Sequence, residues 1–257
     1  MKHAVTFELC AETMQACLAA REGGADRIEL CSALSEEGLT PSHAMIRAAV
    51  AHSGLPVYVL LRPRAGDFVY SDAEFALLKD DLMHACSLGA RGFALGILRP
   101  DATVDVERTR ELVEMAAPLE VTFHRAFDLT RSLDEALEDV IAAGCRRVLT
   151  AGGERDVVIG SANLARLVEL AASRIEIAAG GGLGLDNAAQ VAKVTRALHF
   201  HGSVRGRNVS LTSSGRRALS SFANQVSVVD PAEVRAIIHV LSEAQPEITS
   251  SSSLPSL

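Results

Sequence analysis

The sequence predicts an α/β protein that folds as a single TIM-type (βα)8 barrel. Short β-branched or apolar runs alternate with Ala-rich helical stretches along the whole chain, and eight of each can be counted. Strict alternation of strands and helices is typical of βαβ units around a parallel sheet. The chain has 257 residues, close to the ~250 residues that such a barrel commonly occupies as one domain.

Each expected strand is a short run rich in apolar or β-branched residues, and each expected helix carries apolar residues at helical spacing. The expected strands are Val5–Cys10, Arg27–Cys31, Pro56–Arg62, Gly92–Ile97, Leu119–His124, Arg147–Thr150, Arg174–Ala178 and Ala197–His201. The expected helices are Glu12–Glu22, Pro41–His52, Asp72–Ser87, Asp105–Ala116, Leu133–Ala143, Ser161–Ala171, Asp186–Val194 and Pro231–Ala244.

Glycine marks three of the junctions between a helix and the next strand. Gly24, Gly89 and Gly144 each follow a helical stretch, where a left-handed C-cap lets the chain turn back toward the sheet. They lie two βα units apart, and this regular phasing favours an eightfold barrel. A doubly wound open sheet is the alternative, because it also alternates strands and helices.

The barrel is expected to span residues 1–244. The polar segment 202–229 is long for a loop after the eighth strand, and we expect it to fold over the strand ends. The last residues, 245–257, include the run Ser250–Ser253 and are expected to form a disordered tail.

Composition excludes several classes of protein. The formal net charge is −7, whereas a nucleic-acid binder normally presents a basic face. No apolar run approaches the ~18 residues of a membrane span, and the first residues lack the layout of a signal peptide. Five cysteines form an odd set without zinc-site spacing, which favours a reducing compartment. We therefore expect a cytoplasmic protein without nucleic-acid or membrane partners.

A tripeptide recurs at the ends of the first two strands. Glu8-Leu9-Cys10 ends the first, and Glu29-Leu30-Cys31 ends the second. Side chains alternate along a strand with a period of two, so Glu and Cys share one face of each strand. Neighbouring strands are about 4.8 Å apart. The repeat therefore predicts two carboxylates and two thiols together at one side of the barrel mouth.

Charged residues at other strand ends complete a candidate catalytic set. In a TIM barrel the chemistry collects at the carboxyl ends of the strands. The candidates are Glu8, Glu29, Arg62, Arg64, His124 and His201. Charged groups are rarely buried unless they are paired or used in function. For any single one of these residues there is a structural alternative. The rim arginines could simply form ion pairs with Glu8 and Glu29 and have no role in catalysis.

A glycine-rich run after the seventh strand predicts an anion site. Gly180-Gly181-Gly182 precedes the helix expected near Asp186, and Gly202-Ser203 follows the eighth strand. Backbone N–H groups ahead of a helix can bind an anion, and the loops after strands 7 and 8 often form a phosphate site in such barrels. We expect Arg62 and Arg64 to contact the far end of the ligand. The alternative is that these glycines only close a tight turn.

The absence of several sequence motifs argues against some cofactors and reaction classes. The chain has three lysines, Lys2, Lys79 and Lys193, and none lies at a strand end. Schiff-base chemistry with pyridoxal phosphate is therefore not expected. Neither a P-loop nor a complete Gly-x-Gly-x-x-Gly fingerprint is present, so nucleotide and flavin cofactors are not expected either.

Several longer motifs resemble one known family. They are Glu8–Cys10, Gly24–Ser32, Gly38–Pro41, Arg62–Arg64, Gly66–Phe68, Tyr70–Asp72, Thr122–Asp128, Arg147–Thr150, Gly180–Gly182 and His201–Ser203. Together they resemble the CutC family of copper homeostasis proteins, from about Phe7 to Arg205. Two departures lie in loops beside the rim: Ala65 replaces a usual Gly, and Ala151-Gly152-Gly153 replaces a usual Ser-Gly start.

The resemblance implies a TIM-type barrel, a cytosolic location, a homo-oligomer and a role in copper homeostasis. It also implies Cu(I) binding by paired cysteines, which match Cys10 and Cys31. Cu(I) prefers soft thiolates, and a shared ion requires the two sulfurs to lie within about 5 Å. The structural alternative is that both cysteines are small apolar fillers.

Two further functional hypotheses stay open at the level of sequence. One is an enzyme of unknown reaction acting on a small anionic or phosphorylated substrate. In that enzyme the arginines would orient the anion, a histidine would move protons, and Glu8 or Glu29 would act as base or orient a histidine. The other is a non-catalytic scaffold.

Overall fold

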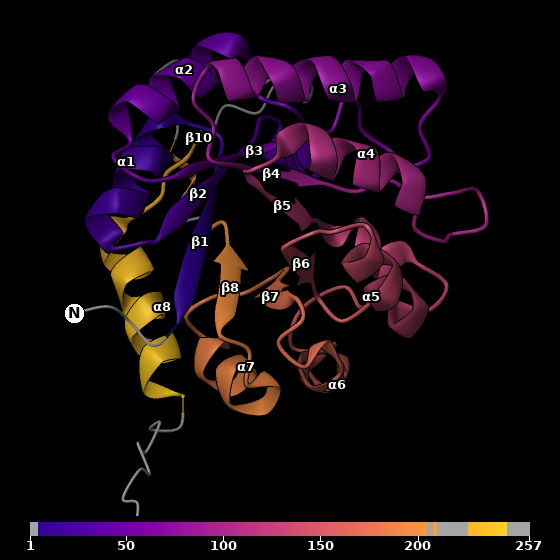
Figure 1. The fold of residues 1–257 in the computed structure, drawn as a ribbon. Coiled ribbons are helices and arrows are strands. Elements are labelled where there is room, and N and C mark those ends of the chain that lie inside the picture. Colours follow the sequence, from indigo (N-terminus) through magenta and orange to yellow (C-terminus); the bar gives the residue numbers. More distant parts are fainter. Residues whose placement is uncertain (1–4, 205–207, 210–225, 246–257) are drawn as a thin grey trace, which may run out of the picture.

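The computed structural model describes residues 5–204, 208–209 and 226–245. Its centre is a closed barrel of eight parallel strands in sequence order (Figure 1). The strands are β1 (Thr6–Ala11), β2 (Arg27–Leu30), β3 (Val57–Leu60), β4 (Gly92–Leu95), β5 (Glu120–Phe123), β6 (Arg147–Thr150), β7 (Glu176–Gly180) and β8 (His199–Gly202). The last strand pairs with the first, with Phe7 opposite Phe200. The predicted (βα)8 barrel is confirmed.

The α-helices of the described chain surround this barrel (Figure 1). They are α1 (Met14–Gly23), α2 (His43–His52), α3 (Asp72–Ser87), α4 (Val106–Ala116), α5 (Leu133–Ala142), α6 (Ser161–Ala171), α7 (Ala188–Thr195) and α8 (Pro231–Glu243). Local sequence sets where they begin. Ser71 and Glu74 form a capping box before α3, and the Asp230 side chain caps α8, with Pro231 in its first turn.

Some expected boundaries were wrong. The third strand ends at Leu60 and not at Arg62, because the Arg62 N–H donates to Thr40 Oγ1 at 2.9 Å and Pro63 has no N–H to continue the ladder. The helix expected from Asp186 begins at Ala188. Two short 3-10 helices, η1 (Leu34–Glu36) and η2 (Arg125–Leu129), were not expected.

The expected loop 202–229 begins inside β8, because Gly202 is the last residue of that strand. Two short antiparallel strands, β9 (Asn208–Val209) and β10 (Val226–Ser227), pair within this segment. Residues 205–207 and 210–225 of the loop lie outside the described residues, as do residues 246–257 of the expected tail. Among the described helices, none combines the length and the apolar character needed to cross a membrane.

The main apolar core lies between the strands and the surrounding helices. Fully buried phenylalanines of four strands belong to it: Phe7, Phe93, Phe123 and Phe200. Alternate residues of the strands point toward the barrel interior. A second, much smaller apolar cluster consists of Cys10, Cys31, Leu60 and Ala94. The barrel interior is thus left largely to polar side chains.

Paired charges fill the barrel interior beneath this small cluster. The guanidinium of Arg147, almost fully buried, contacts Glu176 at 2.5 Å and Glu120 at 3.3 Å. The Tyr58 hydroxyl donates a hydrogen bond to Glu120 at 2.7 Å, and the Arg27 guanidinium lies 5.2 Å from the centre of the Tyr58 ring. Such charges are tolerated in the interior because they are paired. They form the base on which the site is built.

Candidate functional site

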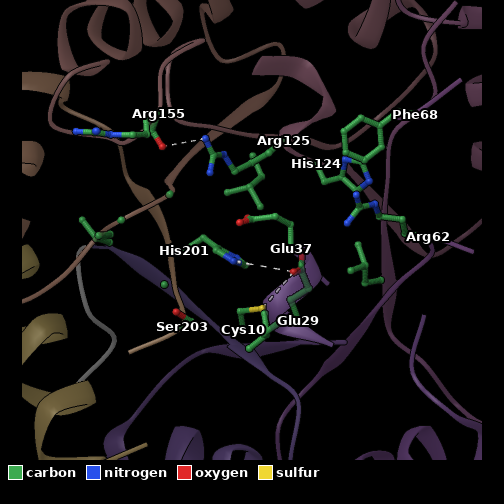
Figure 2. Close-up of a pocket in the computed structure, with 17 residues that line it drawn as sticks. Cys10, Glu29, Glu37, Arg62, Phe68, His124, Arg125, Arg155, His201 and Ser203 are labelled. Carbon is green, nitrogen blue, oxygen red and sulfur yellow. Dashed lines mark hydrogen bonds and ion pairs between the residues drawn. The ribbon is translucent and has the colours of Figure 1, made fainter. Parts of the chain in front are cut away.

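A pocket opens at the carboxyl ends of the strands, where TIM barrels hold their active sites. Its volume is about 340 Å³, a size typical of small-molecule sites. Figure 2 shows the side chains that line it, drawn from both strand ends and loops. The labelled residues are Cys10, Glu29, Glu37, Arg62, Phe68, His124, Arg125, Arg155, His201 and Ser203.

Cys10, which lines this pocket, lies directly beside Cys31. Their Sγ atoms are 3.7 Å apart, because β1 and β2 pair with Cys10 level with Glu29, two residues before Cys31. Cys10 lines the pocket, whereas Cys31 is fully buried behind it. The hydrogen bond with Cys31, together with burial, raises the pKa of the Cys10 thiol well above its usual value. Cys10 is therefore protonated at neutral pH.

Glu8 lies below the pocket and holds His201. One carboxylate oxygen of Glu8 accepts a hydrogen bond from His201 Nδ1 at 2.8 Å, and the other accepts one from Arg27 Nε at 2.5 Å. Burial alone would raise the pKa of Glu8, but the charges of Arg27 and His201 outweigh burial and hold it well below its usual value. Glu8 is thus a fixed carboxylate that orients the His201 ring.

Cys10, Glu29 and His201 bring three potential ligand atoms within 4.8 Å of one another. Cys10 Sγ lies 3.6 Å from Glu29 Oε1, and His201 Nε2 lies 4.0 Å from the same oxygen (Figure 2). Glu29 Oε2 is buried and has no hydrogen-bond partner among the described residues. This cluster can hold a metal ion or exchange protons with a ligand.

The pKa values of Glu29 and His201 in this cluster are both shifted. Burial raises the pKa of the Glu29 carboxyl, and the nearby charge of Glu8 adds to the effect. Burial alone would lower the pKa of His201, but Glu29, Cys10 and Glu8 outweigh it and raise this pKa well above its usual value. His201 is accordingly an imidazolium between two carboxyl groups.

Arg62 and His124 form another part of the wall. The Arg62 guanidinium lies 4.9 Å from the centre of the Phe68 ring, and the Phe68 and His124 ring centres are also 4.9 Å apart. Burial and the Arg62 charge lower the pKa of His124 to about 3. Nδ1 of this neutral ring accepts a hydrogen bond from the Ala126 N–H at 3.1 Å. The ring proton is therefore on Nε2.

The structure brings most of the catalytic candidates to one pocket. Glu29, Arg62, His124 and His201 line it, and Glu8 supports His201 from below. Arg64 does not line it, and the expectation that Arg64 contacts a ligand there is corrected. Its guanidinium pairs with the side chains of Glu74 and Asp67, because the two-residue alternation stops where β3 ends, before Pro63.

The predicted anion-binding residues are only partly together. Gly181, Gly182, Gly202 and Ser203 line the pocket. Gly180 is the last residue of β7 and is not part of the pocket wall. Residues of α7, the helix that follows this glycine run, do not line the pocket either.

Sequence reasoning missed three charged residues of the wall: Glu37, Arg125 and Arg155. Each belongs to a loop or a 3-10 helix, where no strand alternation predicts the direction of a side chain. Arg125 directly follows His124, at the end of the fifth expected strand. This position, inside the motif Thr122–Asp128, is the sequence feature from which Arg125 could have been predicted to line the pocket.

Comparison with known proteins identifies the family of the chain. The model of the CutC family matches residues 5–206. The chain belongs to the CutC family. Two relatives, both described as family protein CutC, come from Chromobacterium violaceum and Vibrio vulnificus. The first is 41% identical over 93% of this chain and 98% of its own, and the second is 43% identical over 82% and 86%.

A solved CutC structure has the same barrel. It is a copper homeostasis protein CutC by description and comes from Streptococcus agalactiae. Its sequence is 31% identical, the match covers 77% of this chain and 98% of that one, and the TM-score is 0.72. The family resemblance inferred from the motifs is thus confirmed, and copper homeostasis is the role named in the description of the Streptococcus agalactiae protein.

Proposed function

We propose that this CutC-family chain binds Cu(I), as its cargo, through Cys10 and Cys31. The observation that carries the proposal is the 3.7 Å distance between two buried sulfurs at adjacent strand ends. This distance is shorter than the 5 Å limit set by a shared ion. Thiolates are the ligands that Cu(I) prefers among protein side chains. The copper homeostasis description of the Streptococcus agalactiae relative supports the same assignment.

His201 is the natural third ligand once its imidazolium has released the proton on Nε2. Imidazole suits copper, and His201 Nε2 belongs to the cluster that surrounds Cys10. Glu8 fixes the opposite ring nitrogen at 2.8 Å, which is the arrangement that orients metal-binding histidines in proteins. Glu29 has a hard oxygen donor, so we assign it a different role.

Glu29 would take up a proton when copper binds. The Cys10 thiol is protonated at neutral pH because its pKa is raised by Cys31 and by burial. A metal binds the thiolate, so loading must release protons. Cys10 Sγ already lies 3.6 Å from Glu29 Oε1, and the second oxygen of that carboxyl has no partner among the described residues.

Anaerobic titration with Cu(I) against a chromophoric Cu(I) chelator tests the proposal. The wild-type protein should take up one ion per chain, and X-ray absorption should report two sulfur ligands. A variant carrying both Cys10→Ser and Cys31→Ser should lose this uptake. Cys17→Ser is the matched control, because Cys17 is also buried but lies on α1, and uptake should be unchanged. Undiminished uptake in the double variant would overturn the assignment.

The cytosolic location and the homo-oligomer implied by the resemblance stay predictions. Cell fractionation tests the first, and sedimentation of the purified protein tests the second. A stable monomer at all accessible concentrations would contradict self-association.

A further inference from the structure

In the loop after β7, the carbonyls of Gly181 and Gly182 accept hydrogen bonds from described residues, whereas the amides of the same two glycines donate to none of them. The Gly181 carbonyl accepts a hydrogen bond from the Val157 N–H at 2.9 Å, and the Gly182 carbonyl accepts one from Asn187 Nδ2 at 2.9 Å. The N–H groups of Gly181 and Gly182 have no acceptor among the described residues. Both glycines line the pocket, with φ of +112° and +72°. Successive free amides in such loops form concave anion sites.

Arg125 adds a positive charge beside these amides. A Cβ on Gly181 would lie 2.9 Å from both Cζ and Nη1 of Arg125, so only glycine admits this close approach. Arg125 Nε donates to Asp128 at 2.8 Å, and Nη2 donates to two backbone carbonyls of the loop that carries Glu154. These contacts fix the guanidinium. Nη1 makes no hydrogen bond within the described chain.

Two buried side chains elsewhere on the pocket wall also carry unused polar atoms. Arg62 and His124 are only 5% and 6% exposed, and both line the pocket. Arg62 Nε and His124 Nε2 are buried without a hydrogen-bond partner in the described chain. The pKa of His124 is lowered to about 3 by burial and by Arg62, so its Nε2 is a donor at neutral pH. An unpaired buried polar group costs free energy unless a ligand satisfies it.

We propose that this pocket binds a small phosphate monoester. Its phosphate lies against the amides of Gly181 and Gly182 and against Arg125 Nη1. Its remaining polar groups reach Arg62 and His124. A volume of about 340 Å³ accommodates such a molecule.

Charge favours a phosphate over a neutral or cationic ligand. Three arginines line the pocket, Arg62, Arg125 and Arg155, against the carboxyl groups of Glu29 and Glu37. A phosphate monoester offers three oxygens to several donors at once, and charge-assisted contacts with guanidinium groups are among the stronger hydrogen bonds. The proposal requires neither cysteine sulfur and is independent of copper binding.

Calorimetric titration of the copper-free protein tests the proposal, with inorganic phosphate and glycerol 3-phosphate as probes and acetate as the carboxylate comparison. Both phosphates should bind, the ester more tightly, and acetate should bind at least tenfold more weakly. Arg125→Met should weaken phosphate binding roughly tenfold or more, since it removes a charged hydrogen-bond donor. Arg64→Met is the matched control, because this rim arginine does not line the pocket, and it should leave the affinity unchanged.

Amide chemical shifts give a second readout that does not depend on a variant's folding. Phosphate should move the Gly181 and Gly182 signals of the wild-type protein. The proposal fails if these signals stay in place at saturating phosphate. It also fails if acetate binds as well as phosphate, or if Arg64→Met weakens binding as much as Arg125→Met.

Discussion

Acidification should destabilise the protein through His124, and the substitution His124→Asn should remove this component. The folded pKa of His124 is about 3, against 6.5 for an unperturbed histidine. Between these values the unfolded chain binds a proton at this residue and the folded protein does not. The stability linked to His124 is therefore complete above pH 6.5 and falls as the pH drops toward 3.

The two pKa values set the magnitude. At pH 6 the loss amounts to about 0.8 kcal/mol, and at pH 5 to about 2 kcal/mol, relative to pH 8. Asn is a suitable replacement because His124 is the N-cap of η2 and its side chain accepts the Ala126 N–H. Asn can make the same capping contact but does not titrate.

Urea denaturation at pH 5, 6, 7 and 8 measures the effect. The free energy of unfolding of the wild type should fall relative to that of His124→Asn by about 2 kcal/mol between pH 8 and pH 5. Phe123→Leu serves as the control, because it perturbs the neighbouring buried position without a titrating group and should lower stability equally at every pH. A wild-type-to-variant difference that does not change with pH would refute the argument.

Three other perturbations have defined outcomes. Arg27→Met leaves the Glu8 carboxylate without its guanidinium and should lower the free energy of unfolding, measured by urea denaturation, by about 3–5 kcal/mol. Arg146→Met removes an arginine from a half-exposed ion pair and should lower it by less than about 1 kcal/mol. Similar losses in the two variants would contradict the role of burial. Asp128→Ala leaves the N–H groups of Ala151 and Gly153 unpaired and should lower stability by about 3 kcal/mol; an unchanged midpoint would show that water replaces the carboxylate. Cu(I) at a hundredfold excess over its Kd should stabilise the wild type by about 2.7 kcal/mol, seen as a higher Tm that the double cysteine variant lacks; an equal rise in that variant would place the ion elsewhere.

Strand periodicity explains which parts of the site were predictable. Glu8, Cys10 and Glu29 lie on the paired strands β1 and β2, and Cys31 directly follows β2. The repeat of Glu-Leu-Cys was therefore sufficient to predict that their side chains share one face. In a regular strand each side chain points to one of only two faces. A sequence pattern is therefore sufficient to predict which residues share a face.

The rest of the site depends on backbone that leaves the strands. Arg64 follows Pro63 and turns to Glu74 on the outside, whereas Arg125 enters the pocket because η2 and Asp128 position it. The two-residue alternation of side chains along a strand predicts the side-chain direction of neither arginine. The turn contacts that occupy the carbonyls of Gly181 and Gly182 come from Val157 and Asn187, and such contacts are visible only in three dimensions.

The unequal exposure of Cys10 and Cys31 affects the order in which an incoming ion or reagent reaches them. Cys31 has no exposed surface, whereas Cys10 is slightly exposed and lines the pocket. On the route through the pocket, a reagent or ion therefore meets Cys10 before Cys31. A molecule occupying the pocket would lie across that same route, so an ion would have to enter before the molecule and leave after it. Exchange of copper would then be slowed by a pocket ligand even where the affinity for copper is unchanged.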